Sequence, residues 1–152
     1  MTCFICGIAF LASLLVSSVN ADDVSTKDLA RIQGIWRLAS IEVPDHEFPP
    51  REQPKNATMT IKGNKMLRSL PDGTAQEYEF KLNASAAPKA IDIHFPGAND
   101  KKSKQDVFGV YSLEGDELKM CTGRPSKERP KELKKTEANA VLVFRREKPS
   151  EK

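Results

Sequence analysis

Two arginines that each precede a proline are the residues best suited to hold a ligand. Arg124 and Arg129 stand in the stretch RPSKERP. Proline fixes its own backbone φ and favours an extended backbone in the residue before it, so this loop should be stiff. Two guanidinium groups on a stiff loop can hold a carboxylate or a phosphate through paired hydrogen bonds. The alternative is a solvated loop in which the arginines pair with Glu128 and Glu132.

One cysteine, Cys121, lies shortly before this loop. Its thiolate would be a nucleophile if Arg124, Lys127 or Arg129 lowered its pKa. Free cysteine is also among the residue types most often buried, and no histidine stands near Cys121 in the sequence to act as its base. We therefore expect a buried, unreactive thiol.

The residue types needed for a metal site or for a known catalytic motif are sparse. The two histidines, His46 and His94, have no metal-ligand spacing. The chain also lacks a Gly-x-Ser-x-Gly elbow, a P-loop and a Ser-x-x-Lys motif. We therefore expect no metal, no cofactor and no catalytic residue.

The elements that must position these side chains are short strands. Apolar and polar residues alternate with period two, which is typical of half-buried strands, in about eight runs separated by turn residues. The runs span residues 35–43, 57–61, 65–70, 78–82, 90–95, 107–113, 117–121 and 141–147. Short strands joined without intervening helices predict one all-β domain, an antiparallel up-and-down barrel of about eight strands.

A short helix is expected before the first strand. Ser25 would be its N-cap, with Asp28 completing a capping box. Leu29 and Ile32 would share its apolar face, and Gly34 suits its end. A helix of about two turns is stable only when it packs against something, so we expect it to lie across one end of the barrel.

The interior of an eight-stranded barrel is just wide enough for its own side chains or for one small ligand. The sequence leaves open which face of each strand points inward. The candidate wall residues of a ligand site are Tyr78, Phe80, Ile93, Phe95 and Tyr111. Arg124 or Arg129 would stand at the rim. Large aromatic residues pointing inward would fill the barrel, whereas small ones such as Ala57 and Gly109 would leave a cavity.

The only tryptophan stands two residues after a glycine, where the helical pattern gives way to the alternating one. Trp36 can plug the barrel, and Gly34 allows a sharp turn from helix to strand. Burying an indole is worth about 4 to 6 kcal/mol. Gly34-Ile35-Trp36 resembles the Gly-x-Trp signature of the lipocalins, in which an arginine at the end of the last strand stacks across the tryptophan. Arg145 or Arg146 stands in the matching place, so the resemblance implies a cation–π contact there.

Four longer phrases resemble a family of exported, lipocalin-like domains that is abundant in planctomycete bacteria. These phrases are DLARIQGIWRLASIEV, APKAIDIHF, GVYSLEGDELKMC and RPSKERP. The resemblance covers nearly the whole chain after residue 21. It implies a lipocalin-like barrel and export, and it implies no activity, cofactor or ligand.

The N-terminal segment has the pattern of a secretory signal. The first 21 residues carry no charged side chain, and Cys3–Val16 is an apolar run of the length of a signal-peptide core. Val19 and Ala21 place small residues at −3 and −1 of a cleavage after Ala21. The predicted division is a signal peptide over 1–21, a barrel domain over 22–146 and a disordered charged tail over 147–152. An uncleaved N-terminal anchor is the alternative. Cleavage would leave Cys121 without a disulfide partner in the chain.

The charge of the chain constrains its partners. A formal net charge of +3 is far from the strongly basic surface of a nucleic-acid-binding protein. The segment KERPKELKK carries five positive and two negative residues, so it could contact an anionic partner in the cell envelope, although most such runs are simply solvated. We expect no stable membrane insertion after cleavage.

We therefore expect an exported, periplasmic or extracellular barrel that binds a small apolar or anionic amphipathic molecule without catalysis. The alternative is a structural or interaction module of the cell envelope. Its barrel would be filled by its own side chains and would hold no small ligand.

Overall fold

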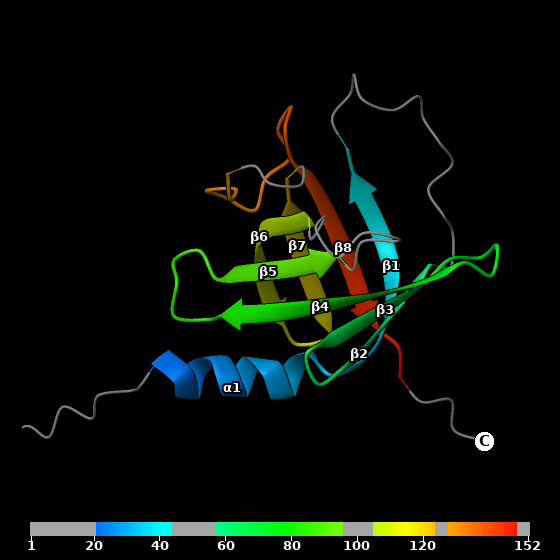
Figure 1. Ribbon diagram of the computed structural model, residues 1–152, viewed down its shortest axis with the longest axis horizontal. Coiled ribbons are helices and arrows are strands. Elements are labelled where there is room, and N and C mark those ends of the chain that lie inside the picture. Colours follow the sequence, from blue (N-terminus) through cyan, green and yellow to red (C-terminus); the bar gives the residue numbers. More distant parts are fainter. Residues whose placement is uncertain (1–20, 44–56, 96–104, 124–127, 149–152) are drawn as a thin grey trace, which may run out of the picture.

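The computed structural model describes residues 21–43, 57–95, 105–123 and 128–148 (Figure 1). Within these ranges one helix precedes eight strands. The elements are α1 (Ala21–Ile32), β1 (Gly34–Glu42), β2 (Thr58–Lys62), β3 (Lys65–Ser69), β4 (Ala75–Asn83), β5 (Ala90–Phe95), β6 (Gln105–Glu114), β7 (Glu117–Thr122) and β8 (Ala140–Arg146). The predicted order of one short helix followed by eight strands is confirmed.

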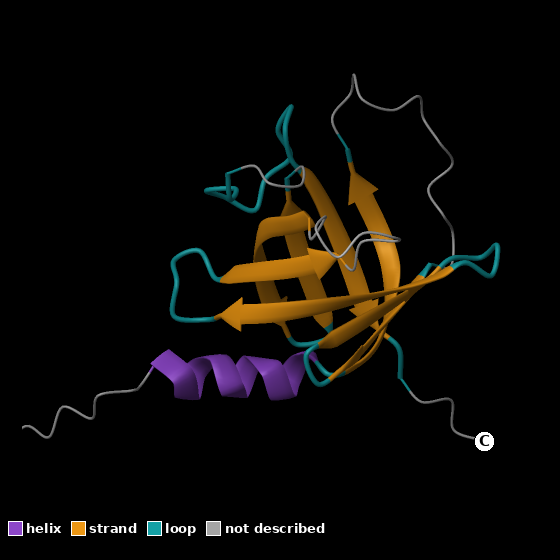
Figure 2. Ribbon diagram, in the orientation of Figure 1, coloured by secondary structure: helices purple, strands orange, loops and turns teal. Residues whose placement is uncertain are grey.

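The strands form a closed barrel. Each strand pairs antiparallel with the next strand in the sequence, and β8 returns to pair with β1. A bulge between Leu38 and Ser40 interrupts the β1–β8 pairing, and bulges of this kind bend a strand in a closed sheet. Figure 2 shows the strands curving around a common interior, with the helix outside it. The predicted antiparallel up-and-down barrel is confirmed.

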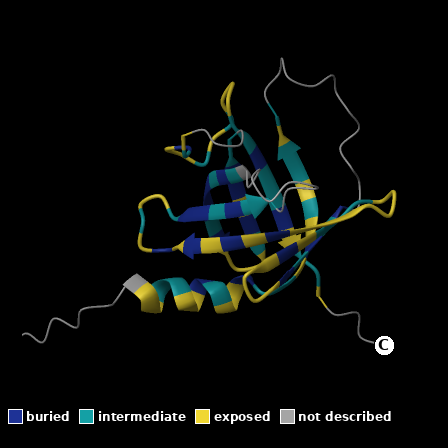
Figure 3. Ribbon diagram, viewed as in Figure 1, coloured by how far each residue is buried: buried dark blue, intermediate teal, exposed yellow. Residues whose placement is uncertain are grey.

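The alternation along each strand decides which side chains point inward. In β4, Tyr78, Phe80 and Leu82 are buried while the residues between them are exposed. In β5, Ile91 and Ile93 belong to the same core cluster. Figure 3 shows this banding of buried and exposed positions along the strands. The core therefore lies inside the barrel, on the faces that the period-two pattern assigns to alternate residues.

The predicted start of the helix is wrong. The helix begins at Ala21, the residue at which the signal peptide was predicted to end, and it runs for 12 residues rather than about two turns. Ser25 lies inside it, and its hydroxyl oxygen accepts a hydrogen bond from the backbone N–H of Ala84 at 3.1 Å. Asp28 is buried against the barrel and forms no capping box. The side chains that resembled a cap bind partners on the barrel instead.

The helix closes one end of the barrel. Ile32 and Leu29 pack into the core beside β4, where Figure 1 shows the helix lying. Trp36 is completely buried next to them, and its indole N–H donates to the carbonyl oxygen of Ile32 at 2.8 Å. The indole therefore plugs this end with its one polar atom satisfied, and its burial stabilises the fold by about 4 to 6 kcal/mol.

Candidate functional site

A cavity of about 160 Å³ lies inside the barrel at the end away from α1. Its described lining comes from seven of the eight strands and from Ala57, the residue before β2. The lining residues are Leu38, Ala57, Thr58, Met59, Met66, Arg68, Tyr78, Ile93, Phe95, Met120, Thr122, Leu142 and Phe144. Most of these side chains are apolar, so the cavity suits an apolar group.

The position of the cavity follows from the sizes of the inward side chains. Near α1 the interior is filled by Trp36, Tyr111 and Leu118, all fully buried or nearly so. Toward the other end the lining includes Ala57 and Thr122, whose side chains are short. A cavity of about 150 Å³ lined by apolar side chains can hold a molecule of the size of benzene. The barrel is therefore filled at one end and hollow at the other.

Tyr78, predicted as a wall residue, lines this cavity. Its ring meets the ring of Phe95 edge to face, with centroids 4.7 Å apart. Its hydroxyl donates to Oε1 of Gln76 at 2.5 Å. The ring therefore gives the cavity apolar surface, while a neighbour on the same strand satisfies its polar atom. Of the other predicted wall residues, Ile93 also lines the cavity, whereas Phe80 lies in the filled part of the core.

Tyr111, the second predicted binding tyrosine, lies at the opposite end, against α1. Its hydroxyl donates to Oδ2 of Asp28 at 2.9 Å, and Nζ of Lys89 contacts the same oxygen at 2.7 Å. Burial, together with the hydrogen bond to Asp28, raises the pKa of the Tyr111 hydroxyl. This tyrosine belongs to the attachment of the helix and does not line the cavity.

The carboxylate of Asp28 is the centre of that attachment. Its burial acts to raise its pKa, but the hydrogen bonds from Lys89 and Tyr111 act in the opposite direction. The positive charges of Lys89 and Arg31 add to this effect, so the pKa of Asp28 lies below its ordinary value. Asp28 therefore stays ionised at neutral pH and fixes α1 to the barrel.

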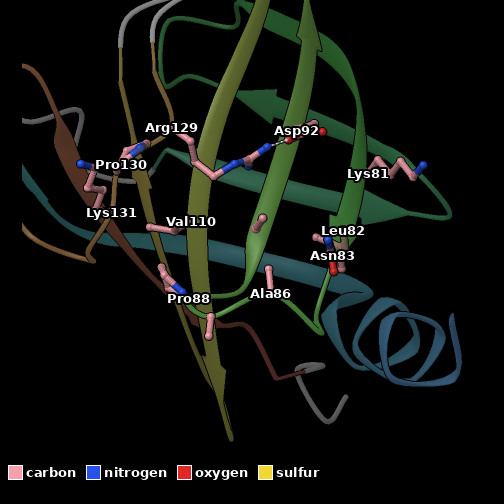
Figure 4. Close-up of a pocket in the computed structure, with 12 residues that line it drawn as sticks. Lys81, Leu82, Asn83, Ala86, Pro88, Asp92, Val110, Arg129, Pro130 and Lys131 are labelled. Carbon is pink, nitrogen blue, oxygen red and sulfur yellow. Dashed lines mark hydrogen bonds and ion pairs between the residues drawn. The ribbon is translucent and has the colours of Figure 1, made fainter. Parts of the chain in front are cut away.

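Of the two arginines predicted to hold a ligand, the structure describes only Arg129. Arg124 lies outside the described residues. Arg129 lies on the outer face of the barrel, in a groove of about 500 Å³ (Figure 4). Its Nη2 pairs with Oδ1 of Asp92 at 2.6 Å, and its Nη1 donates to the carbonyl oxygen of Gly109 at 2.7 Å. The guanidinium also lies over the ring of Phe108, 5.4 Å from its centre.

These contacts give Arg129 a clear structural task. Its guanidinium binds β5 and β6 from outside, so it holds the segment that follows β7 against the barrel wall. Its ion-pair partner is Asp92, rather than the predicted Glu128 or Glu132. Because Asp92 already occupies the guanidinium, a ligand anion would have to displace this pair. Arg129 does not line the interior cavity.

A cluster of three residues, Gly34, Trp36 and Arg146, lies at the filled end of the barrel. The guanidinium carbon of Arg146 lies 4.2 Å from the centre of the Trp36 ring. Gly34 has a φ of 120°, and a Cβ at this position would lie 3.1 Å from Nη1 of Arg146. Glycine therefore provides both the backbone conformation and the room that the arginine needs.

Arg146 also satisfies the end of the helix. Its Nη1 donates to the carbonyl oxygen of Gln33 at 2.6 Å, and its Nη2 donates to that of Arg31 at 2.5 Å. Carbonyl groups at a helix C-terminus have no partner within the helix. Of the two candidate arginines, Arg146 stacks on Trp36, whereas Arg145 is exposed and pairs with Glu117 at 3.3 Å. Arg146 therefore links the last strand to the helix and to the tryptophan.

Cys121 lies on the outer side of β7 and is completely buried. It packs with Val110 and Val141, and its Sγ donates to the carbonyl oxygen of Lys134 at 3.5 Å. Burial raises the pKa of the thiol, since charged sulfur is disfavoured away from water. The geometry favours the packing role over the nucleophilic one.

Arg68 is a residue of the cavity that the sequence pattern did not single out. It lies on β3 in the same alternation as Met66, which is buried in the core, and it lines the interior cavity. In register it pairs with Met59 on β2 and with Gln76 on β4. The guanidinium is the only charged group in the described lining of the cavity.

Comparison with models of known protein families, with curated proteins and with solved structures found no match. Within the described ranges, no helix has the length and apolar character needed to cross a membrane. The same residues contain no group of three or more His, Cys, Asp or Glu side chains placed to hold a metal ion. The fold and its cavity therefore define the class of the protein, a closed eight-stranded antiparallel barrel with one hollow end.

Proposed function

We propose that this barrel binds a small apolar or amphipathic molecule, without catalysis, in the cavity at the end away from α1. The observation that carries the proposal is the uneven filling of the interior. The end next to α1 is packed with Trp36 and Tyr111, whereas the other end keeps a cavity of about 160 Å³ with a mostly apolar lining. Natural cores leave few voids larger than a water molecule, so a cavity of this size favours a ligand-binding function.

The size of the cavity limits the ligand and its affinity. An apolar group of about six carbon atoms matches the size of benzene. Burying about six such carbons at about 0.8 kcal/mol each gives roughly 5 kcal/mol, which corresponds to a Kd below about 1 mM. A larger ligand would have to extend out of the barrel.

A different function is favoured by the filled end. A barrel whose interior is packed beside α1 can serve as a structural or interaction module of the cell envelope, with the basic segment after β7 as its contact surface. This function needs no ligand, so the two proposals differ in whether the cavity binds anything.

Thermal unfolding with and without 1-hexanol separates the two. A ligand that binds only the folded state raises the unfolding midpoint in a saturable way. We expect this rise for the wild type and its loss in Ala57→Leu, in which the larger side chain occupies the cavity. A midpoint that does not rise, or that rises equally in Ala57→Leu, would exclude binding in the cavity and leave the interaction module.

We also propose that the chain is exported. The support is the absence of charged side chains from its first 21 residues, the apolar run within them, and the resemblance to an exported lipocalin-like family. That this chain belongs to the family stays a prediction. N-terminal sequencing of the protein recovered outside the cytoplasm of a bacterial host should begin at Asp22. A chain retained with its first residues intact would contradict cleavage.

A further inference from the structure

The described lining of the interior cavity carries one positive charge and no negative one. Arg68 is half-buried, and its side chain belongs to the cavity lining together with Tyr78 and Phe95. The described lining has no aspartate or glutamate. An apolar space with a single guanidinium suits a molecule that has an apolar part and an anionic group.

Arg68 differs from every other arginine in the described part of the chain. Five of these arginines form ion pairs with carboxylates. They are Arg31 with Asp28, Arg37 with Glu147, Arg129 with Asp92, Arg145 with Glu117 and Arg146 with Asp116. Within the same ranges, the guanidinium of Arg68 has neither an ion pair nor a hydrogen bond. Its donors are therefore available to a ligand.

A second polar group stands beside it. Gln76 pairs with Arg68 in register across β3 and β4, and its Oε1 accepts the hydroxyl of Tyr78. This arrangement leaves the amide N–H groups of Gln76 for a further acceptor. A carboxylate held by the guanidinium would lie within the same part of the rim.

We propose that the ligand of this barrel is a small amphipathic carboxylate, whose anionic group binds Arg68 while an apolar part of about six carbons fills the cavity. This inference rests on the proposed function, since it names the chemical class of the molecule that the same cavity binds. Arg68 rather than Arg129 takes the anion-binding role within the described residues, and the role expected for Arg124 stays a prediction.

Isothermal titration calorimetry with hexanoate and 1-hexanol tests the inference, because the two probes differ only in the charged group. At pH 7 and low salt the wild type should bind hexanoate about tenfold more tightly than 1-hexanol. This factor is at the low end of the range for a hydrogen bond to a charged group, because Arg68 is half-exposed. Arg68→Gln should remove this preference and keep the affinity for 1-hexanol. The matched control is Lys65→Gln, which removes a positive charge from the outer face of the same strand and should leave both affinities unchanged.

The outcomes separate this inference from the proposed function. Equal binding of the two probes by the wild type, or a preference for hexanoate that survives in Arg68→Gln, would overturn the role of Arg68 and leave ligand binding intact. Failure of both probes to bind the wild type would remove the proposed function itself. If Arg68→Gln does not fold, salt gives the second test: the preference of the wild type should shrink between 0.05 and about 1 M NaCl, and a preference that stays constant would contradict the inference.

Discussion

Replacing Arg146 with methionine should lower the free energy of unfolding by about 3 kcal/mol at pH 7. Methionine keeps an unbranched apolar stem, so the change removes the guanidinium and little of the packing. The loss should be large because this one group contacts the Trp36 ring and two carbonyl groups at the end of α1.

The magnitude follows from those contacts. A guanidinium 4.2 Å from the centre of a completely buried indole is worth about 1 kcal/mol as a cation–π contact. The hydrogen bonds to the carbonyl oxygens of Gln33 and Arg31 are worth about 1 kcal/mol each, since carbonyl groups at a helix C-terminus have no partner within the helix. The ion pair with Asp116 adds little, because that carboxylate is largely exposed.

Urea unfolding followed by circular dichroism measures the effect, and the neighbouring arginine provides the control. Arg145→Met removes the same group from the same strand, but Arg145 is exposed and should leave the urea midpoint almost unchanged. A double-mutant cycle of Arg146→Met with Trp36→Leu should give a coupling energy of about 1 kcal/mol.

Two results would refute this reasoning. Equal destabilisation by Arg145→Met and Arg146→Met would show that the position of Arg146 has no special role. A coupling energy near zero between Arg146 and Trp36 would show that the stacking does not contribute to stability.

Three further predictions concern the rest of the fold. Asp28→Asn should lower the unfolding free energy by about 2 kcal/mol at pH 7. Because folding holds the pKa of this carboxyl below its usual 3.8, its stabilisation is complete above that value and is lost as the pH falls below it. The urea midpoints of wild type and variant should therefore converge in acid, while the exposed Asp23→Asn stays close to wild type throughout. Cys121 should alkylate slowly in the folded protein and rapidly in urea, as measured by peptide mass mapping; fast reaction in the folded state would restore the nucleophilic interpretation. Gly109→Ala should lower the unfolding free energy by about 1 to 3 kcal/mol, because a Cβ there would lie 2.9 Å from the carbonyl oxygen of Cys121. An unchanged urea midpoint would show that β6 and β7 can move apart to make room for the methyl group.

The strands could be predicted because their signals are local. Alternation with period two and Gly, Asn or Asp at the turns depend on neighbouring residues, and these signals gave the strand order and the closed barrel. The stacking arginine could be narrowed only to Arg145 or Arg146. Adjacent residues of a strand face opposite sides, so only one of the two can reach Trp36. The bulge between Leu38 and Ser40 shifts the β1–β8 register, so counting residues along the two strands does not decide which one it is.

The long-range contacts could not be predicted in the same way. Asp28 binds Lys89 and Tyr111, which lie 61 and 83 residues further along the chain. The sequence around Asp28 therefore indicated only a local capping role for this carboxylate. Arg68 was missed because Met66 and Leu67 are both apolar, which leaves two ways to assign the inward face of β3. The exposure of Leu67 resolves it. The signal available in the sequence was that Arg68 stands two residues after Met66, and such residues lie on the same face of a strand.

Methionine methyl NMR tests ligand binding in the cavity most directly, since three of the four methionines line it. These are Met59, Met66 and Met120. On titration with 1-hexanol, the methyl signals of all three should shift in a saturable way with one common Kd, and Ala57→Leu should abolish the shifts. Signals that stay in place, or that drift linearly and equally in wild type and Ala57→Leu, would show that the barrel does not bind small amphipathic molecules in its interior.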